Sequence, residues 1–401
     1  MYGLAHFIVV VIVRSKSIHV ASVLFIATAA LFLGWTLFAL WHVRWMRRLP
    51  AIAATAPTPG ASRTKCSVVI AARDEEARIE QTIRHLLEQV EVELEIIVVD
   101  DRSTDRTGEI LQRLVKQDAR LQVKRVDVLP EGWLGKCHAC HIGATADTGD
   151  WILFTDGDCW LKPDVITRAL RVAERDQADH ITLTSGLAVE SPGLRAGHVA
   201  FLMTLANWFS GVNLDRPKSF LGFGAFNLVR AAAYRQCGGY EALRLTVLDD
   251  VKLGLLLRRA GKRTRGFIGG DDARCYWGTT VWSSVKLLEK NYFAAVDYRT
   301  GLVTALLAVV LFVLSIVIFG LLSGTALGFV AGLSPLTLIL PAAIVAHRLG
   351  WSWTSAIGVP FLFPLFLYAL GNSVFVTLRQ GGIRWRETFY PLATLRAGNV
   401  R

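Results

Sequence analysis

The sequence predicts an α/β domain with a mostly parallel sheet, flanked by transmembrane helices. Three observations support this fold class. Apolar, strand-like runs alternate with helix-like segments through the middle of the chain, which is typical of a parallel sheet covered on both faces. Most of the charge lies in this middle part, at about residues 64–298. Both ends carry apolar stretches long enough to cross the ~30 Å hydrocarbon core of a bilayer.

The composition agrees with a membrane-bound enzyme. The 401 residues are 52% hydrophobic and only 19% charged, which is less polar than a soluble protein of this size. A net charge of +11 would suit nucleic acid, but the basic residues are scattered or lie beside apolar stretches, where they would meet anionic lipid headgroups. No nucleic-acid-binding motif is present. We therefore expect a lipid bilayer as a partner and no nucleic acid.

The first 48 residues are expected to form an N-terminal membrane anchor. The run Val20–Trp41 is apolar, carries no charge and is followed by three arginines. A signal peptide is the alternative, but the earlier run at 3–13 is short, lacks a basic start and is followed by Arg14 and Lys16. The run Val20–Trp41 lacks a small-residue cleavage pattern. The arginines predict that the following domain is cytoplasmic. Residues 49–63, rich in Pro, Ala and Thr, are expected to be a linker.

The domain at 64–298 should contain alternating strands and helices. Strands are expected at 66–72, 95–99, 121–128, 151–155 and 181–185. Apolar residues at helical spacing predict helices after residue 75, around residue 110, after Gly135 and after Pro163. The segment 192–214 is either an interfacial helix or part of the core.

The six cysteines do not form a disulfide framework, and a cytoplasmic domain would keep them reduced. Cys137 and Cys140, with His138 and His141 beside them, resemble half of a zinc site. A structural zinc needs four ligands, and no second C-x-x-C is present. We therefore expect a reduced, partly buried helix face.

Acidic clusters mark the candidate site. Asp156-Gly157-Asp158 follows an apolar strand, Asp100-Asp101 ends an earlier strand, and Asp249-Asp250 opens a later segment. Paired carboxylates at a strand end can hold a divalent cation with open positions for phosphates. Ligands of parallel sheets bind at the carboxyl ends of the strands. The three clusters together indicate a nucleotide-sugar site, although each alone would be an ordinary cap or turn.

The chain resembles family 2 glycosyltransferases with the GT-A fold over about residues 65–295. The matching stretches are Val69–Glu76, Val98–Asp105, Phe154–Asp158 and Leu248–Asp250. The segment Leu129–Lys136 and the flanking apolar stretches resemble the membrane-bound hopanoid-associated and carotenoid-type enzymes, with ceramide glucosyltransferases as more distant relatives.

The resemblance implies roles by position. The loop of Ala71, Arg73 and Glu76 would lie against the nucleotide, and Asp100 and Asp101 would include the acceptor for the uracil imide. Lys136 would reach the pyrophosphate. Asp156 and Asp158, with Gly157 between them, would hold Mg²⁺ or Mn²⁺. Asp250, with Asp249 beside it, would act as the general base.

The resemblance departs at one motif. Processive family members carry Gln/Arg-x-x-Arg-Trp after the base, and residues 276–291 lack it. This favours transfer of a single sugar over polysaccharide synthesis. Trp282, Lys286 and Lys290 would either close over the diphosphate or anchor an amphipathic helix at the headgroups.

The C-terminal part should contain transmembrane segments at 299–378. Apolar stretches lie at 302–330, 336–346 and 356–378, and the short middle one is either re-entrant or joined to its neighbour. Arginines at 379, 384 and 386 predict a basic cytoplasmic tail over 379–401 and an even number of crossings; three crossings are the alternative.

These features together predict an inverting hexosyltransferase. Its chain would cross the inner membrane several times. It would move one sugar from a nucleotide-sugar, usually a UDP-sugar, to a lipid hydroxyl, on a hopanoid or related isoprenoid. A sphingolipid, diacylglycerol or a polyprenyl phosphate would be a second choice of acceptor, and for the phosphate Arg244 and Lys252 would supply cations. Two further classes of protein fit the sequence less well: a polysaccharide synthase and a non-catalytic nucleotide-sugar-binding scaffold.

Overall fold

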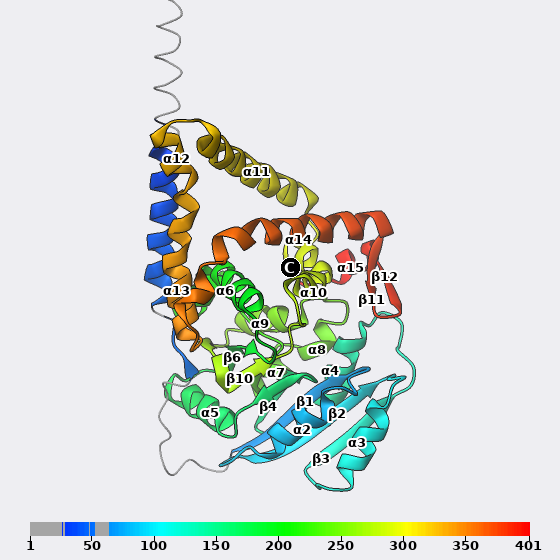
Figure 1. The fold of residues 1–401 in the computed structure, drawn as a ribbon. Coiled ribbons are helices and arrows are strands. Elements are labelled where there is room, and N and C mark those ends of the chain that lie inside the picture. Colours follow the sequence, from blue (N-terminus) through cyan, green and yellow to red (C-terminus); the bar gives the residue numbers. More distant parts are fainter. Residues whose placement is uncertain (1–25, 27–28, 48, 53–63) are drawn as a thin grey trace, which may run out of the picture.

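The computed structural model describes residues 26, 29–47, 49–52 and 64–401. Its centre is a seven-stranded sheet in the order β3-β2-β1-β4-β8-β6-β9 (Figure 1). The strands are β1 (Lys65–Ala72), β2 (Glu93–Asp101), β3 (Leu121–Val126), β4 (Trp151–Asp156), β6 (His180–Thr184), β8 (Asn227–Arg230) and β9 (Thr264–Ile268). Only β8 runs antiparallel to its neighbours. The expected mostly parallel α/β sheet is confirmed, and each expected strand ends within two residues of the observed one.

Alternation along the strands assigns the helices to the two faces of the sheet. Val68 and Ile70 of β1 face one core, together with apolar residues of α2, α3 and α5. Val69 faces the other core, together with residues of α4 and α9. Successive strand side chains point to opposite faces, so runs of apolar residues bury both of them. The helices of the domain are α2 (Ile79–Leu87), α3 (Thr107–Val115), α4 (Gly135–Thr145), α5 (Val165–Arg175), α6 (Pro192–Asn213), α7 (Ala231–Gln236), α8 (Gly239–Ala242), α9 (Asp249–Arg259) and α10 (Val281–Ala295).

A small second sheet corrects the expectation that all cysteines are reduced. It consists of β5 (Cys159–Leu161), β10 (Ala273–Cys275) and β7 (Gly186–Leu187), with the turn η2 (Gly270–Asp272) before β10. β5 and β10 pair antiparallel with Cys159 directly opposite Cys275, and the two form a disulfide. The sequence did not predict this pairing because the cysteines are 116 residues apart. Cys137 and Cys140 are free and buried in α4, as expected.

Two helical segments after the domain are long and apolar enough to cross a membrane, at Thr300–Leu322 and Ala326–Arg348. The first is α11; the second joins α12 (Ala326–Gly332), η3 (Ser334–Leu338) and α13 (Ile339–Arg348). The short stretch at 336–346 therefore joins its neighbour. Within the described residues, a third span is possible only if the pair Trp353–Leu362 and Pro364–Gln380, bent by 50°, counts as one. This pair holds η4 (Trp353–Ala356) and α14 (Val359–Gln380), with Pro364 inside the helix.

The N-terminal anchor is only partly within the described residues, where residues 29–46 are helical. This helix runs alongside α12 and α13 (Figure 1), and Arg348 donates a hydrogen bond to the carbonyl of Arg47. The expected linker largely lies outside the described residues. Its start is part of the fold, since Ile268 of β9 donates to the carbonyl of Pro50 and Ala51 bridges to Ile268.

The C-terminal residues are folded against the domain. β11 (Gly382–Trp385) and β12 (Thr388–Pro391) form a hairpin, and α15 (Leu392–Gly398) follows. Ile383, Tyr390, Leu392 and Leu395 are buried in the same core as α4 and α9. The expected tail over 379–401 is therefore an ordered part of the domain, because its alternating apolar residues bury against the α4 side of the sheet.

Candidate active site

One large cavity, of about 1220 Å³, lies at the carboxyl ends of β1, β2 and β4. Its polar side is lined by the ends of these strands, the first turns of α4 and α9, and the loop before β8. Its other side is apolar and is formed by α6, α10, α11 and α14. A typical small-molecule site measures about 300–1,000 Å³, so this cavity has room for two substrates.

Asp156 and Lys136 form an ion pair at the centre of the polar side. Asp156 is the last residue of β4, and Lys136 is the second residue of α4. Lys136 Nζ lies 2.7 Å from Asp156 Oδ1 and 3.7 Å from Asp249 Oδ2. Burial opposes the positive charge, but the three acids Asp156, Asp249 and Asp250 outweigh it and raise the pKa of Lys136. A permanent ammonium group therefore lies among the carboxylates.

Asp158 and Glu75 extend the acidic cluster. Burial, with Asp156 and Glu75 nearby, raises the pKa of Asp158 to about 7. Burial also raises the pKa of Glu75, against the effect of Arg386 and Arg78. Such carboxyl groups are short of positive charge, and oxygen donors of this kind suit Mg²⁺ or Mn²⁺. The residues therefore fit a divalent cation.

The disulfide limits which atoms can be ligands. One carboxylate oxygen of Asp158 and the sulfur atoms of Cys159 and Cys275 lie within 4.8 Å of one another. The two sulfur atoms are bonded to each other, so they offer no thiolate. Asp156 and Asp158 remain the best candidates for holding the cation.

Asp249 and Asp250 open α9 and have different surroundings. Asp249 is buried and accepts a hydrogen bond from Tyr240 Oη at 3.0 Å. Asp250 accepts bonds from the backbone N–H groups of Gly224 at 2.7 Å and Val251 at 2.8 Å. Burial and the neighbouring Asp249 raise the pKa of Asp250 to about 6. Asp250 thus has the properties of a base that works near neutral pH.

Gly224 lies between the carboxylates of Asp156 and Asp250. A Cβ atom at Gly224 would lie 2.6 Å from Asp156 Oδ2 and 3.4 Å from Asp250 Oδ2. The backbone at Gly224, in the Gly-rich segment before β8, therefore makes a close contact, and any side chain there would enter the space between the two carboxylates.

The polar side of the cavity contains some of the residues that were expected to bind a nucleotide. Ala71, Arg73, Asp101 and Gly157 line it. Asp101 accepts two hydrogen bonds from Arg102, at 2.7 Å and 3.0 Å. These residues follow β1, β2 and β4, so parallel pairing brings them to one edge.

Two expected binding residues do not line the cavity. Asp100 is buried behind it, 2.7 Å from Arg125 Nη1. Glu76 is exposed and accepts a hydrogen bond from Arg106 at 3.1 Å. Its neighbour Glu75, which was not expected to bind, lines the cavity instead. Asp74 has a left-handed backbone, with φ 53°, and local patterns did not reveal which glutamate this turn directs inward.

Helix α10 contributes one of the three residues considered for the diphosphate. Lys290 lines the cavity and lies 3.6 Å from the ring centre of Trp385. Lys286 and Trp282 are exposed, and the Trp282 ring stacks on Tyr368 of α14. The outer face of α10 thus agrees with the amphipathic interpretation, and its inner face with the site.

The C-terminal hairpin supplies residues that the sequence did not predict. Trp385, Arg386 and Tyr390 line the cavity. No local motif marks them, and only the hairpin's return to α4 brings them there. Of the two cations considered for a phosphate acceptor, Lys252 lines the cavity but pairs with Asp297 at 2.9 Å. Arg244 packs on Trp133 and is not part of the lining.

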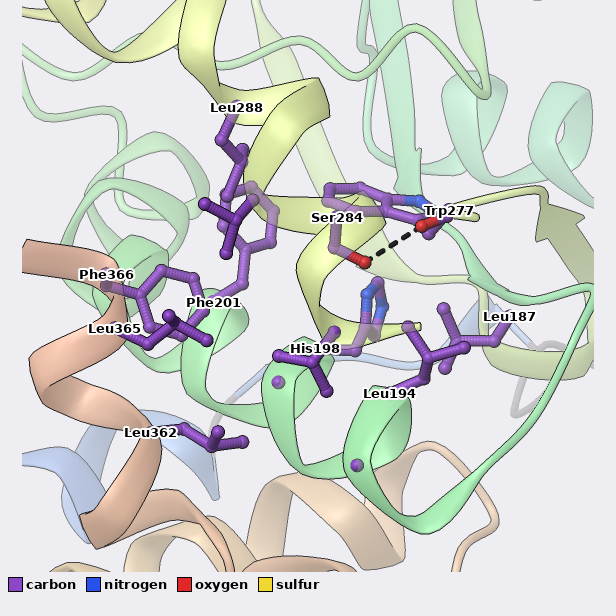
Figure 2. Close-up of a pocket in the computed structure, with 14 residues that line it drawn as sticks. Leu187, Leu194, His198, Phe201, Trp277, Ser284, Leu288, Leu362, Leu365 and Phe366 are labelled. Atoms are coloured by element: carbon purple, nitrogen blue, oxygen red, sulfur yellow. Dashed lines mark hydrogen bonds between the residues drawn. The ribbon is translucent and has the colours of Figure 1, made fainter. Parts of the chain in front are cut away.

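A small pocket of about 30 Å³ lies beside the apolar side of the cavity, between α6, α10 and α14 (Figure 2). His198, Phe201, Trp277, Leu288 and Phe366 line both spaces. Ser284 donates a hydrogen bond to the Trp277 carbonyl at 2.8 Å, and this bond fixes the wall that the two spaces share. Further apolar residues that line the larger cavity include Leu202, Leu205, Trp208, Phe220, Leu287, Leu302, Leu306, Val310, Leu367 and Leu370.

The sequence was compared with protein families and with known proteins. Residues 67–238 match the model of the family described as glycosyl transferase family 2. A 4,4'-diaponeurosporenoate glycosyltransferase of Staphylococcus haemolyticus is 27% identical over 204 residues, which cover 50% of this chain and 53% of that protein. A beta-monoglucosyldiacylglycerol synthase of Nostoc sp. is 28% identical over 191 residues, which cover 47% of this chain and 40% of that protein. The matches thus span about half the length of these relatives or less.

A solved structure agrees with the fold. The mannosyltransferase PcManGT from Pyrobaculum calidifontis, in complex with GDP-Man and Mn²⁺, superposes with a TM-score of 0.51 and 17% identity. The match covers 88% of this chain and 97% of that one. It confirms the GT-A fold of the α/β domain.

Proposed function

We propose that this chain, whose residues 67–238 form a family 2 glycosyltransferase domain, moves one sugar from a nucleotide-sugar to a hydroxyl group of a membrane lipid. One observation carries the proposal. A single cavity joins Lys136, Asp156 and Asp250 to a wall of apolar side chains from α6, α11 and α14. The polar side suits a nucleotide-sugar, and the apolar side suits a lipid.

Asp250 is proposed as the general base. Its carboxylate would take the proton of the acceptor hydroxyl while the oxygen attacks the anomeric carbon. The bond between that carbon and the diphosphate breaks, and its electron pair leaves with the nucleoside diphosphate. A single displacement of this kind inverts the anomeric configuration. Lys136 would stabilise the charge that develops on the diphosphate.

Asp156 and Asp158 are proposed to hold Mg²⁺ or Mn²⁺. The cation would neutralise charge on the leaving diphosphate. The raised pKa of Asp158 agrees with the assignment, because it reflects burial first and then the neighbouring carboxylates of Asp156 and Glu75. The Mn²⁺ in the PcManGT complex also supports it.

The acceptor is proposed to be a lipid with a large apolar body. Leu302, Leu306 and Val310 belong to α11, a candidate membrane span, and line the cavity that holds Asp250. A lipid could therefore keep its apolar part in the bilayer while its hydroxyl reaches the base. The relatives named for a diaponeurosporenoate and a diacylglycerol support a lipid acceptor. A hopanoid or related isoprenoid remains our choice within this class.

The proposed location is the inner membrane, with several crossings and the catalytic domain in the cytoplasm, although the Cys159–Cys275 disulfide is more typical of an oxidising compartment. The two candidate spans support the crossings. The hairpin at residues 382–391 packs on the domain, so the chain after the last apolar helix lies on the domain's side of the membrane. This favours an even number of crossings between them.

The test is nucleotide release by the full chain in lipid nanodiscs. Purified protein is given a panel of UDP-sugars and GDP-mannose, with Mn²⁺ or Mg²⁺ and a lipid extract. We expect metal-dependent release of nucleoside diphosphate, and a glycolipid one sugar heavier than its acceptor. Products with long sugar chains would contradict single transfer. Nucleotide binding without release from any donor would favour a binding scaffold.

A further inference from the structure

We infer that the C-terminal hairpin, Gly382–Pro391, is a wall of the donor site and that Arg386 at its tip binds the diphosphate of the donor together with Lys290. The inference rests on the proposed function, since it concerns the same cavity. It assigns a binding role to a segment whose sequence predicted only a basic tail.

The hairpin lies against the elements that carry the central ion pair. Tyr390 Oη accepts a hydrogen bond of 3.4 Å from the backbone N–H of Gly135, the residue before Lys136. Tyr390 is buried, and Ile383 anchors the other strand in the same core. The packing therefore fixes the hairpin beside the residue that is expected to meet the diphosphate.

Arg386 points to the acidic end of the cavity. Its Nη2 atom donates a hydrogen bond to Glu75 Oε1 at 3.0 Å, and its Nη1 atom lies 3.7 Å from Asp74 Oδ2. The side chain remains 38% exposed. Ion pairs this exposed contribute little to stability, so exchanging a carboxylate for a phosphate would cost little. A guanidinium group can also bind two phosphate oxygens at once.

The backbone at the tip forms a tight turn. Trp385 pairs with Thr388, so Arg386 and Glu387 form a two-residue loop. Two-residue hairpin loops require positive φ values, and Arg386 has φ 52°. In this turn, Arg386 contacts Glu75 and Asp74.

Lys290 supplies a second cation on the same side. Its Nζ atom lies 3.6 Å from the centre of the Trp385 ring, so the hairpin holds the ammonium group in place. Lys136, Lys290 and Arg386 all line the cavity. They come from α4, α10 and the hairpin, and together they would surround a diphosphate with positive charge.

The carboxylates near Arg386 explain where its side chain lies when no ligand is bound. Glu75 lies close to Asp156 and Asp158, and the three negatively charged carboxylates repel one another. Arg386 offsets part of this charge. A divalent cation at Asp156 and Asp158 would offset it instead, leaving Arg386 available for the diphosphate.

The test is calorimetric binding of UDP and of GDP to the full chain in nanodiscs, with and without Mn²⁺. Arg386→Ala and Arg386→Gly are compared with the control Arg384→Ala. Arg384 lies on the same hairpin, is exposed and does not line the cavity. We expect both Arg386 variants to weaken binding about tenfold or more, and Arg384→Ala to bind like the wild type.

The glycine variant separates binding from folding. Glycine accepts the positive φ without strain, so Arg386→Gly should keep or raise the melting temperature while binding is lost. Wild-type affinity in Arg386→Gly, or equal loss in Arg384→Ala, would overturn the inference and leave the proposed function standing. A wild-type protein that binds neither nucleotide would overturn both.

Discussion

Lys136 Nζ and Asp156 Oδ1 lie 2.7 Å apart, and this pair links the start of α4 to the end of β4. Lys136 Nζ also lies 3.7 Å from Asp249 Oδ2. The backbone of Gly224 approaches Asp156 so closely that a Cβ atom there would lie 2.6 Å from Asp156 Oδ2. The pair therefore joins the proposed metal-binding, leaving-group and base positions in one electrostatic unit. A substitution at any of these positions should therefore alter the electrostatic environment of the others.

Replacing Lys136 by Met should weaken the binding of nucleoside diphosphate. The variant keeps the length of the side chain but removes a cation whose hydrogen bond to a charged group is worth about 1.5–3 kcal/mol. We expect affinity in the presence of Mn²⁺ to fall about 10- to 100-fold, measured by calorimetry. Lys124→Met is the control, since Lys124 is exposed on β3 and does not line the cavity. Unchanged affinity in Lys136→Met would remove Lys136 from the donor site.

Replacing Asp250 by Asn should abolish turnover while leaving donor binding intact. Asparagine has nearly the same shape, and its carbonyl oxygen can still accept the hydrogen bond from Gly224. The loss of a positioned base should lower kcat by about 10²- to 10⁴-fold. The check is a rate assay beside a nucleotide-binding assay on the same preparation. A variant with full kcat would show that another group takes the proton.

The rate should depend on pH through the same residue. Burial and Asp249 raise the pKa of Asp250 to about 6, and a base acts only when it is deprotonated. We therefore expect kcat/KM for the acceptor to reach a plateau above about pH 7, to be half of that value near pH 6 and to fall about tenfold per pH unit below about pH 5. The measurement is a pH profile with saturating donor. A profile that stays flat down to pH 5 would contradict the assignment.

The strands and the three acidic clusters could be predicted because their signals are local. The apolar runs of β2 and β4 end in acids, and parallel pairing brings strand ends to one edge without further information. The choice between Glu75 and Glu76 could not be predicted, since it depends on the left-handed turn at Asp74.

Long-range pairing explains the other differences. Cys159 and Cys275 meet only because β5 and β10 pair across 116 residues. Trp385 and Arg386 reach the cavity only because the hairpin buries Ile383 and Tyr390 beside α4. No short motif in the sequence indicates either contact. For this reason the composition of residues 379–401 predicted a tail, whereas in the structure the hairpin lines the cavity.

Replacing Gly224 by Ala should disrupt the proposed metal and base positions together. The new Cβ atom would lie 2.6 Å from Asp156 Oδ2, closer than any ordinary contact, so the carboxylate must move. We expect Mn²⁺-dependent binding of nucleoside diphosphate to weaken and turnover to be lost. Gly301→Ala is the control, because a Cβ atom there meets nothing within 4 Å. Equal activity of the two variants would show that the close approach has no role.

A tryptophan at Leu306 should raise the KM for the acceptor without affecting the donor. Leu306 lies on α11, lines the cavity and is 43% exposed. The larger ring would fill part of the space proposed for the apolar body of the lipid. Leu311→Trp is the matched control, since Leu311 lies on the same helix, is 64% exposed and does not line the cavity. Both variants add the same apolar surface to a helix that is already apolar, so insertion into the membrane should be equal.

The measurement is KM for the lipid in nanodiscs, together with calorimetric binding of nucleoside diphosphate. A higher KM in Leu306→Trp alone places the acceptor against α11, whereas equal values for the two variants would exclude this wall as the acceptor's path.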